Sequence, residues 1–166
     1  MKHKHLMVAG TALAVLAAIV FSFAFAGEPY LVLTNDETGE VLLRHPAQQG
    51  LEFSISYTHS VNLSPVKELY VINGEDIVLT ALEFETFGAG MPTQLEPGQT
   101  LVHLPGGGMR IEGFDRAVGQ LRYMVGHGAE ITLTLGELQI PLNSLDAPGQ
   151  TVRFSVYQRS FWHRFF

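Results

Sequence analysis

Cysteine is absent from the 166 residues, which excludes disulfides, thiolate chemistry and cysteine-based metal sites. Charge is also scarce, because only 16% of the residues are charged whereas 46% are hydrophobic. Such a composition argues against intrinsic disorder. The length is sufficient for one domain with a hydrophobic core. We therefore expect one folded domain.

Basic residues are especially few beyond the N-terminus. The ten Lys and Arg include Lys2 and Lys4, whereas all 16 Asp and Glu follow residue 26. The remainder thus holds 8 basic against 16 acidic residues, a net charge near −8. Nucleic-acid binding requires a basic surface, so a nucleic-acid partner is not expected. The acidic balance also disfavours adsorption to anionic lipid by charge alone.

The N-terminus is the strongest single signal. Residues 1–5 are short and basic, and residues 6–26 carry no charge. The Ala-Phe-Ala at 24–26 fits a signal-peptidase site, yet the apolar run matches the roughly 20 residues that span a bilayer as a helix. We favour an uncleaved anchor and leave cleavage between Ala26 and Gly27 open. Both interpretations place residues 27–158 outside the cytoplasm, on the outer side of a bacterial inner membrane. Lys2 and Lys4 would stay on the cytoplasmic side.

Short apolar runs separated by turn residues fill the rest of the chain, and no helical period persists. The segment 115–125 is the nearest helix candidate, and Gly119 weakens it. Many short strands at this spacing predict an all-β fold, a single small antiparallel β-sandwich or barrel-like domain after one N-terminal hydrophobic helix. The expected strands are 30–34, 40–44, 51–59, 66–72, 77–86, 100–104, 109–112, 120–125, 130–135, 138–142 and 151–157.

The stretch YTHSVNLSPVKELY, residues 57–70, places a histidine at the end of one predicted strand and a glutamate in the next. Alternation along 51–60 puts Tyr57 and His59 on the core face and Ser60 on the other. The turn register decides whether Glu68 faces His59. Pairing Ser60 with Val66 leaves Glu68 on the outer face, opposite Thr58.

The alternative register pairs Ser60 with Lys67 and places Glu68 opposite His59. It also aligns aromatic and β-branched residues on the core face, which favours it slightly. We weigh two hypotheses for this His59–Glu68 pair. One is a pocket rim that contacts a ligand or partner, and the other is a structural hydrogen bond at the core edge.

The segment ETFGAGMP, residues 85–92, is the second notable stretch. Its glycines allow positive φ or a close approach of the backbone. We weigh a binding loop with exposed amides against a bulge or a crossover between sheets. It is not a phosphate-binding loop, because the GxxxxGK[ST] motif is missing. The candidate contact residues of both stretches are Tyr57, His59, Ser60, Glu68, Phe87, Gly88, Ala89, Gly90 and Met91.

Other motifs give weaker evidence of function. His103 and His127 could join His59 at a metal, yet no HxH or HExxH spacing appears after residue 26, so neither a metal nor a cofactor is expected. The C-terminal tail, residues 159–166, combines aromatic and basic side chains. It suits a membrane interface or partner groove, or alternatively a last strand tucked into the core. Its candidate contact residues are Phe161, Trp162, Arg164 and Phe165.

The two stretches together resemble DUF1850, a family of small bacterial envelope proteins of unknown function encoded beside, or fused to, TAXI-type TRAP transporters. The resemblance extends from about Gly39 to about Tyr157. It supplies no catalytic or binding residues. It implies an association with a tripartite transporter that uses an extracytoplasmic solute-binding protein. The residues that carry it are Tyr57, His59, Ser60, Val66, Glu68, Phe87, Gly88, Ala89, Gly90, Met91 and Pro92.

Three functional hypotheses follow. The first, which we favour, is a membrane-anchored, non-enzymatic accessory subunit that contacts the TRAP permease, the TAXI solute-binding protein or both. The second is a stand-alone periplasmic ligand-binding module with a preformed pocket. The third is an enzyme with His59 as general base, oriented by Glu68, although no nucleophile or cofactor motif supports it.

Overall fold

The computed structural model describes residues 29–88, 92, 94–126 and 130–158. The predicted N-terminal helix lies outside these residues, and no helix within them is long and apolar enough to cross a membrane. The described chain is all-β apart from one short 3₁₀ turn, η1 (Leu142–Ser144). Its strands are β1 (Pro29–Asn35), β2 (Val41–Pro46), β3 (Glu52–Thr58), β4 (Pro65–Asn73), β5 (Asp76–Phe84), β6 (Thr100–His103), β7 (Met109–Ala117), β8 (Leu121–Met124), β9 (Thr132–Leu135), β10 (Leu138–Pro141) and β11 (Thr151–Gln158).

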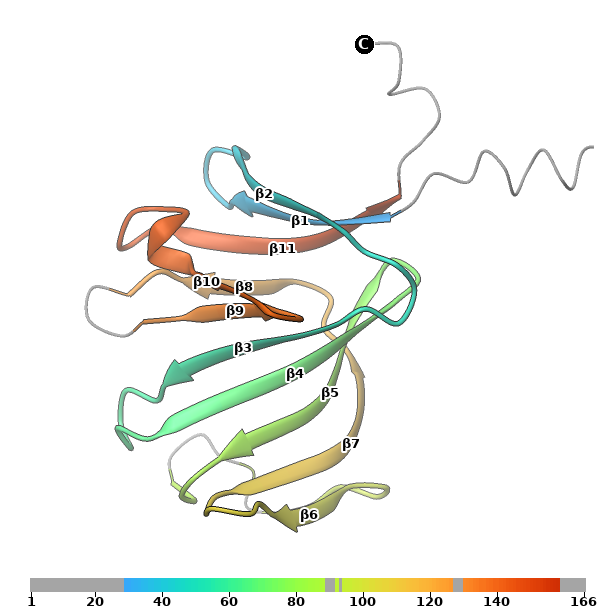
Figure 1. Cartoon of the computed structure of the whole chain (residues 1–166), viewed down its shortest axis with the longest axis vertical. Coiled ribbons are helices and arrows are strands. Elements are labelled where there is room, and N and C mark those ends of the chain that lie inside the picture. The colour runs from blue at the N-terminus through green and yellow to red at the C-terminus, as the bar shows by residue number, and fades with distance from the viewer. Residues whose placement is uncertain (1–28, 89–91, 93, 127–129, 159–166) are drawn as a thin grey trace, which may run out of the picture.

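The strands form two antiparallel sheets in a β-sandwich-like arrangement (Figure 1). One sheet has four strands in the order β2-β1-β11-β8, and the other has seven in the order β10-β9-β3-β4-β5-β7-β6. The predicted antiparallel sandwich is therefore confirmed. Strand β4 is the middle strand of the larger sheet, with three strands on each side of it.

Local turn chemistry explains the hairpins. Between β1 and β2, the Asn35 side chain accepts hydrogen bonds from the backbone N–H groups of Glu37 and Thr38, both at 2.9 Å. Between β4 and β5, Gly74 adopts φ +64°, as a tight Asn-Gly turn requires. These two turns lie where the sequence predicts them.

The segment 115–125 contains no helix and instead runs from the end of β7 into β8. Strand β7 is longer than predicted because Gly113 continues it with φ +86°, and a side chain there would overlap the carbonyl oxygen of Gly98. The pairing of β5 with β7 shifts register in this region. Strands β8 and β9 follow one another along the chain but belong to different sheets.

The main core fills the space between the sheets. Its fully buried side chains come from both layers and include Leu31, Leu33, Ile55, Ile72, Leu133 and Val152. A smaller apolar cluster of Val66, Leu82, Phe84 and Ile111 lies on the large sheet towards β7 and β6. Tyr57 of β3 packs against both clusters, so its side chain lies where they meet.

The two ends of the sandwich differ. The described domain begins at Pro29 and ends at Gln158, and these residues are register partners. Figure 1 shows them on one side, whereas β3 ends, β4 begins and β5 ends on the other side. We call this second side the loop end. Strands of seven to nine residues separate the two ends, roughly 25 Å at about 3.3 Å per residue.

Candidate functional site: a carboxylate–tyrosine cluster and an apolar loop end

Glu68 lies at the centre of the core face of the large sheet. Its register partners are Ile55 on β3 and Leu82 on β5, both buried. A carboxylate between two apolar neighbours is costly unless its oxygens accept hydrogen bonds. The carboxylate oxygens of Glu68 therefore require hydrogen-bond donors within the core.

Three tyrosine hydroxyls donate to this carboxylate. Tyr57 reaches Oε1 at 3.2 Å, and Tyr70 reaches Oε2 at 2.8 Å. Tyr123 also donates to Oε2, and its hydroxyl lies 3.0 Å from that of Tyr70. Because Tyr123 belongs to β8, the cluster joins the two sheets across the core. We call these four residues the tyrosine–carboxylate cluster.

Aromatic packing supports the cluster. Tyr70 stacks on Phe53 with ring centroids 5.2 Å apart, and Phe53 stacks on Phe154 of the opposite sheet at 6.3 Å. Phe154 then meets Tyr123 edge-on at 5.9 Å. Such pairs contribute beyond simple area burial and hold the hydroxyls in place.

The environment keeps the tyrosines protonated. Burial, followed by the negative charge of Glu68, raises the pKa of Tyr57, Tyr70 and Tyr123 well above the usual value of about 10. Hydroxyls held in the protonated state can donate continuously to the carboxylate. The chemistry of the cluster is therefore that of a stable hydrogen-bonded link between sheets.

Both predicted registers are wrong, because Glu68 lies opposite neither His59 nor Thr58. Strand β3 meets β4 with Tyr57 opposite Val66 and Ile55 opposite Glu68. The cause is a shorter loop, because the N–H of His59 donates to the carbonyl of Ser64 at 2.9 Å. The favoured register had placed Glu68 on the correct core face, but with a partner four residues too far along β3.

His59 instead organises the β3–β4 loop. Its Nδ1 accepts from the backbone N–H groups of Val61 at 3.2 Å and Asn62 at 3.4 Å. An accepting Nδ1 requires the proton on Nε2. The imidazole thus caps a turn in the manner of a short polar side chain. The acid–base pair that the enzyme hypothesis needs is not formed.

Two loops meet at the loop end. A side chain on Gly88 would overlap the side-chain amide of Asn62, so the backbone after β5 lies against a side chain of the β3–β4 loop. The Thr86 hydroxyl also approaches that of Ser64 at 3.5 Å. The two sequence stretches that carry the family resemblance are therefore neighbours in space. Ala89, Gly90 and Met91 lie outside the described residues.

Large apolar side chains project from these touching loops. Leu63 is 77% exposed, Val61 is 67% exposed and Phe87 is 50% exposed. Leu63 also adopts φ +50°, which costs an L-residue with a Cβ about 1–2 kcal/mol relative to ordinary backbone. We call Val61, Leu63 and Phe87 the tip patch. Neither the exposure nor the backbone conformation helps the isolated domain to fold.

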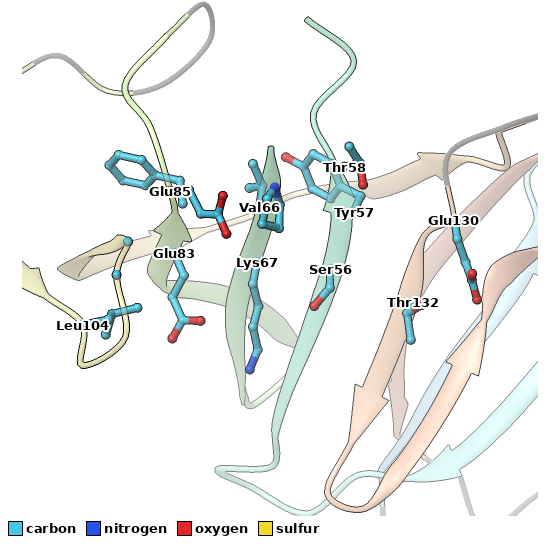
Figure 2. A pocket seen from close by; sticks show the side chains of 14 residues that line it. Ser56, Tyr57, Thr58, Val66, Lys67, Glu83, Glu85, Leu104, Glu130 and Thr132 are labelled. Carbon is cyan, nitrogen blue, oxygen red and sulfur yellow. The ribbon is translucent and has the colours of Figure 1, made fainter. Parts of the chain in front are cut away.

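An open cleft has a volume near 550 Å³ (Figure 2). Its lining residues Thr58, Pro65 and Glu85 adjoin the loops of the tip patch in sequence. Strands β3, β4 and β5 form its floor, and the β6–β7 turn and the start of β9 border it. Its polar lining includes Ser56, Lys67, Glu83, Glu85, Glu130 and Thr132. In Figure 2, Lys67 lies between Glu83 and Ser56, and all three side chains extend to the same side of the sheet.

The remaining predicted site residues are scattered. Ser60 is exposed in the β3–β4 loop, and His103 is exposed on the edge strand β6. His127 and the four tail residues Phe161, Trp162, Arg164 and Phe165 lie outside the described residues. Within the described ranges, no group of three or more His, Asp or Glu is arranged to hold a metal ion.

Sequence reasoning missed several residues of these sites. Tyr70 shares a face with Glu68 two residues earlier on the same strand, so alternation alone could have linked them. Tyr123 gave no comparable signal, because its contact depends on how two sheets pack. Val61 and Leu63 were detectable as apolar residues within an otherwise polar turn.

Comparison with known proteins yields one match. The family model described as "Domain of unknown function (DUF1850)" matches residues 53–142, more than half of the chain. The match is shorter than the resemblance at 39–157, but it includes the tyrosine–carboxylate cluster and the tip patch. No curated protein and no solved structure matches the chain.

Proposed function

We propose, from the premise that the chain belongs to the DUF1850 family, that it is a membrane-anchored, non-enzymatic accessory subunit of a TAXI-type TRAP transporter. Residues 1–26 would hold it in the inner membrane, with the β-domain on the extracytoplasmic side. The family resemblance supplies the transporter, and the charge-free run at 6–26 supplies the anchor.

The tip patch is the observation that carries the proposal. Contiguous apolar surface bordered by polar groups is typical of a protein-binding site. Loops held by a rigid sheet are where such sites are commonly built. Here three exposed apolar side chains stand on two loops that contact each other, and one of them carries an unfavourable backbone conformation.

The position of the termini favours one partner over the other. Because the described domain begins and ends at the side opposite the loop end, an N-terminal anchor would direct the tip patch away from the bilayer. The extracytoplasmic solute-binding protein is then the partner within reach. The permease would contact the domain near Pro29 and Gln158, where the anchor and the tail at 159–166 both join the domain.

Gentle detergent extraction of native membranes tests the proposal. A tag after Phe166 would recover the chain, and mass spectrometry would identify the proteins that accompany it. We expect the permease and the solute-binding protein, with residues 1–26 still attached. Recovery of the chain alone, without residues 1–26, would reject the proposal in favour of a free periplasmic module.

A tip variant separates the two contacts. Val61→Ser, Leu63→Ser and Phe87→Ser together should abolish recovery of the solute-binding protein and retain the permease. The matched control is Leu138→Ser, which removes a side chain that is 48% exposed on the edge strand β10. It should change neither.

A further inference from the structure

The cleft beside the tip patch contains the only lysine that follows residue 4. Lys67 is the third and last lysine of the chain after Lys2 and Lys4, and it lies on the middle strand of the large sheet. Its side chain extends into the cleft from the outer face (Figure 2). A domain rich in acidic residues thus places its one ammonium group in a recess.

The natural counter-ion of Lys67 is already engaged. Glu83 is its register partner on β5. The carboxylate of Glu83 accepts from Nε of Arg110 at 2.8 Å and also pairs with the terminal guanidinium nitrogen. Among the residues that the structure describes, Lys67 forms no salt bridge. The positive charge of Lys67 therefore stays available.

Hydroxyl groups continue the row on the other side of the lysine. Ser56 on β3 is the register partner of Lys67, and Thr132 on β9 is the register partner of Ser56. All three residues line the cleft. An ammonium and two hydroxyls on adjacent strands make donors suited to a carboxylate, which accepts several charge-assisted hydrogen bonds.

The borders of the cleft carry the opposite charge. Glu85 lies at the end of β5, and Glu130 lies just before β9, and both are exposed. They disfavour a ligand with two negative charges and attract a positive one. Leu104 and Pro65 add apolar surface to the walls. The pattern is one donor site for a carboxylate, flanked by acceptors for an ammonium.

We propose that this cleft binds a small zwitterion that carries one carboxylate and one amino group, with the carboxylate on Lys67, Ser56 and Thr132. The inference does not depend on the proposed transporter association, since it concerns another surface. A ligand in the cleft would lie next to the loops of the tip patch, because Thr58 and Pro65 line the cleft and flank the β3–β4 loop.

Saturation-transfer NMR on the full chain in mild detergent tests this directly, with L-alanine, propionate, propylamine and inorganic phosphate as probes. We expect saturable binding of L-alanine, weaker binding of propionate, and none of propylamine or phosphate. Lys67→Gln should weaken L-alanine binding at least about tenfold, because a hydrogen-bonded charge is lost. Arg44→Gln, which removes an exposed cation from strand β2 of the other sheet, is the matched control and should bind normally.

A second pair of variants tests the ammonium site. Glu85→Gln combined with Glu130→Gln should bring the affinity for L-alanine down to that for propionate. Circular dichroism would verify that each variant is folded. Absence of L-alanine binding, equal binding of phosphate, or full binding by the Lys67→Gln variant would each overturn the proposal.

Discussion

The tyrosine–carboxylate cluster and the tip patch depart from the usual burial pattern in opposite directions. Glu68 is a charged group among buried apolar neighbours, whereas Val61, Leu63 and Phe87 are apolar groups in solvent. The interior exception is resolved within the chain, because three hydroxyls satisfy the carboxylate. At the surface, Phe87 packs edge-on against Phe84 yet stays half exposed, and Val61 and Leu63 are more exposed still. We therefore assign a partner to the tip patch.

This comparison separates stability from function. Changes in the cluster should lower the free energy of unfolding and leave the binding surface chemically intact. Changes at the tip patch should alter binding and leave folding nearly unaffected. Variants of each region, together with alkaline pH, test this separation of roles.

Removal of the central carboxylate should have the largest effect. We expect Glu68→Ala to lower the free energy of unfolding by about 2–4 kcal/mol, because three hydroxyls lose their acceptor and a cavity opens. Urea denaturation of the full chain in detergent measures it. Glu137→Ala, an exposed glutamate in the β9–β10 turn, is the control and should be within about 0.5 kcal/mol of wild type.

Alkaline pH should lower the stability of the protein through the same cluster. The unfolded tyrosines lose protons near pH 10, whereas the native tyrosines keep theirs, so stability is complete below about pH 10 and falls as pH rises further. Tyr123→Phe removes one such group. The fall above pH 10 should then become shallower by up to about 1.4 kcal/mol per pH unit. Parallel pH profiles for the two proteins would contradict the account of the cluster.

The contact between the two loops should show an intermediate effect. Gly88→Ala introduces a side chain that overlaps the side-chain amide of Asn62. Because that amide is the end of a flexible side chain and can shift, we expect a loss of about 1 kcal/mol, the low end of the cost of overpacking. Gly119→Ala is the matched control, because nothing lies within 4 Å of the added carbon. If both variants unfold at the same urea concentration, the loops are not packed as described.

Leu63→Asn should have the smallest effect on folding. Asparagine tolerates the left-handed backbone conformation better than leucine, so the free energy of unfolding should stay equal or rise by up to about 1 kcal/mol. Recovery of the solute-binding protein should nevertheless fall. A variant that is destabilised and still binds would reverse the roles that we assign to the two regions.

The sequence predicted much of the fold because the responsible signals are local. Alternation and turn residues such as Asn73-Gly74 located the strands to within a few residues at most ends. The register of β3 with β4 was missed because it depends on one loop hydrogen bond, from His59 to Ser64. Neither residue type announces that bond in the sequence.

The candidate sites were less predictable for a related reason. Glu68 stood out as a charged residue in an apolar strand, yet its contact with Tyr123 joins residues 55 positions apart in different sheets. The availability of Lys67 follows from a competitor, Arg110, that reaches Glu83 from the next strand. Such relations are set by strand order, which alternation does not specify.

Photo-crosslinking in intact cells can identify the protein that contacts the tip patch. A photoreactive residue at position 63 would report what the tip patch contacts, and the same residue at position 138 on edge strand β10 would serve as the comparison. We predict an adduct of the chain with the solute-binding protein from position 63 and none from position 138. An adduct with the permease from position 63, or equal labelling from both positions, would contradict the assignment of the loop end as the partner surface.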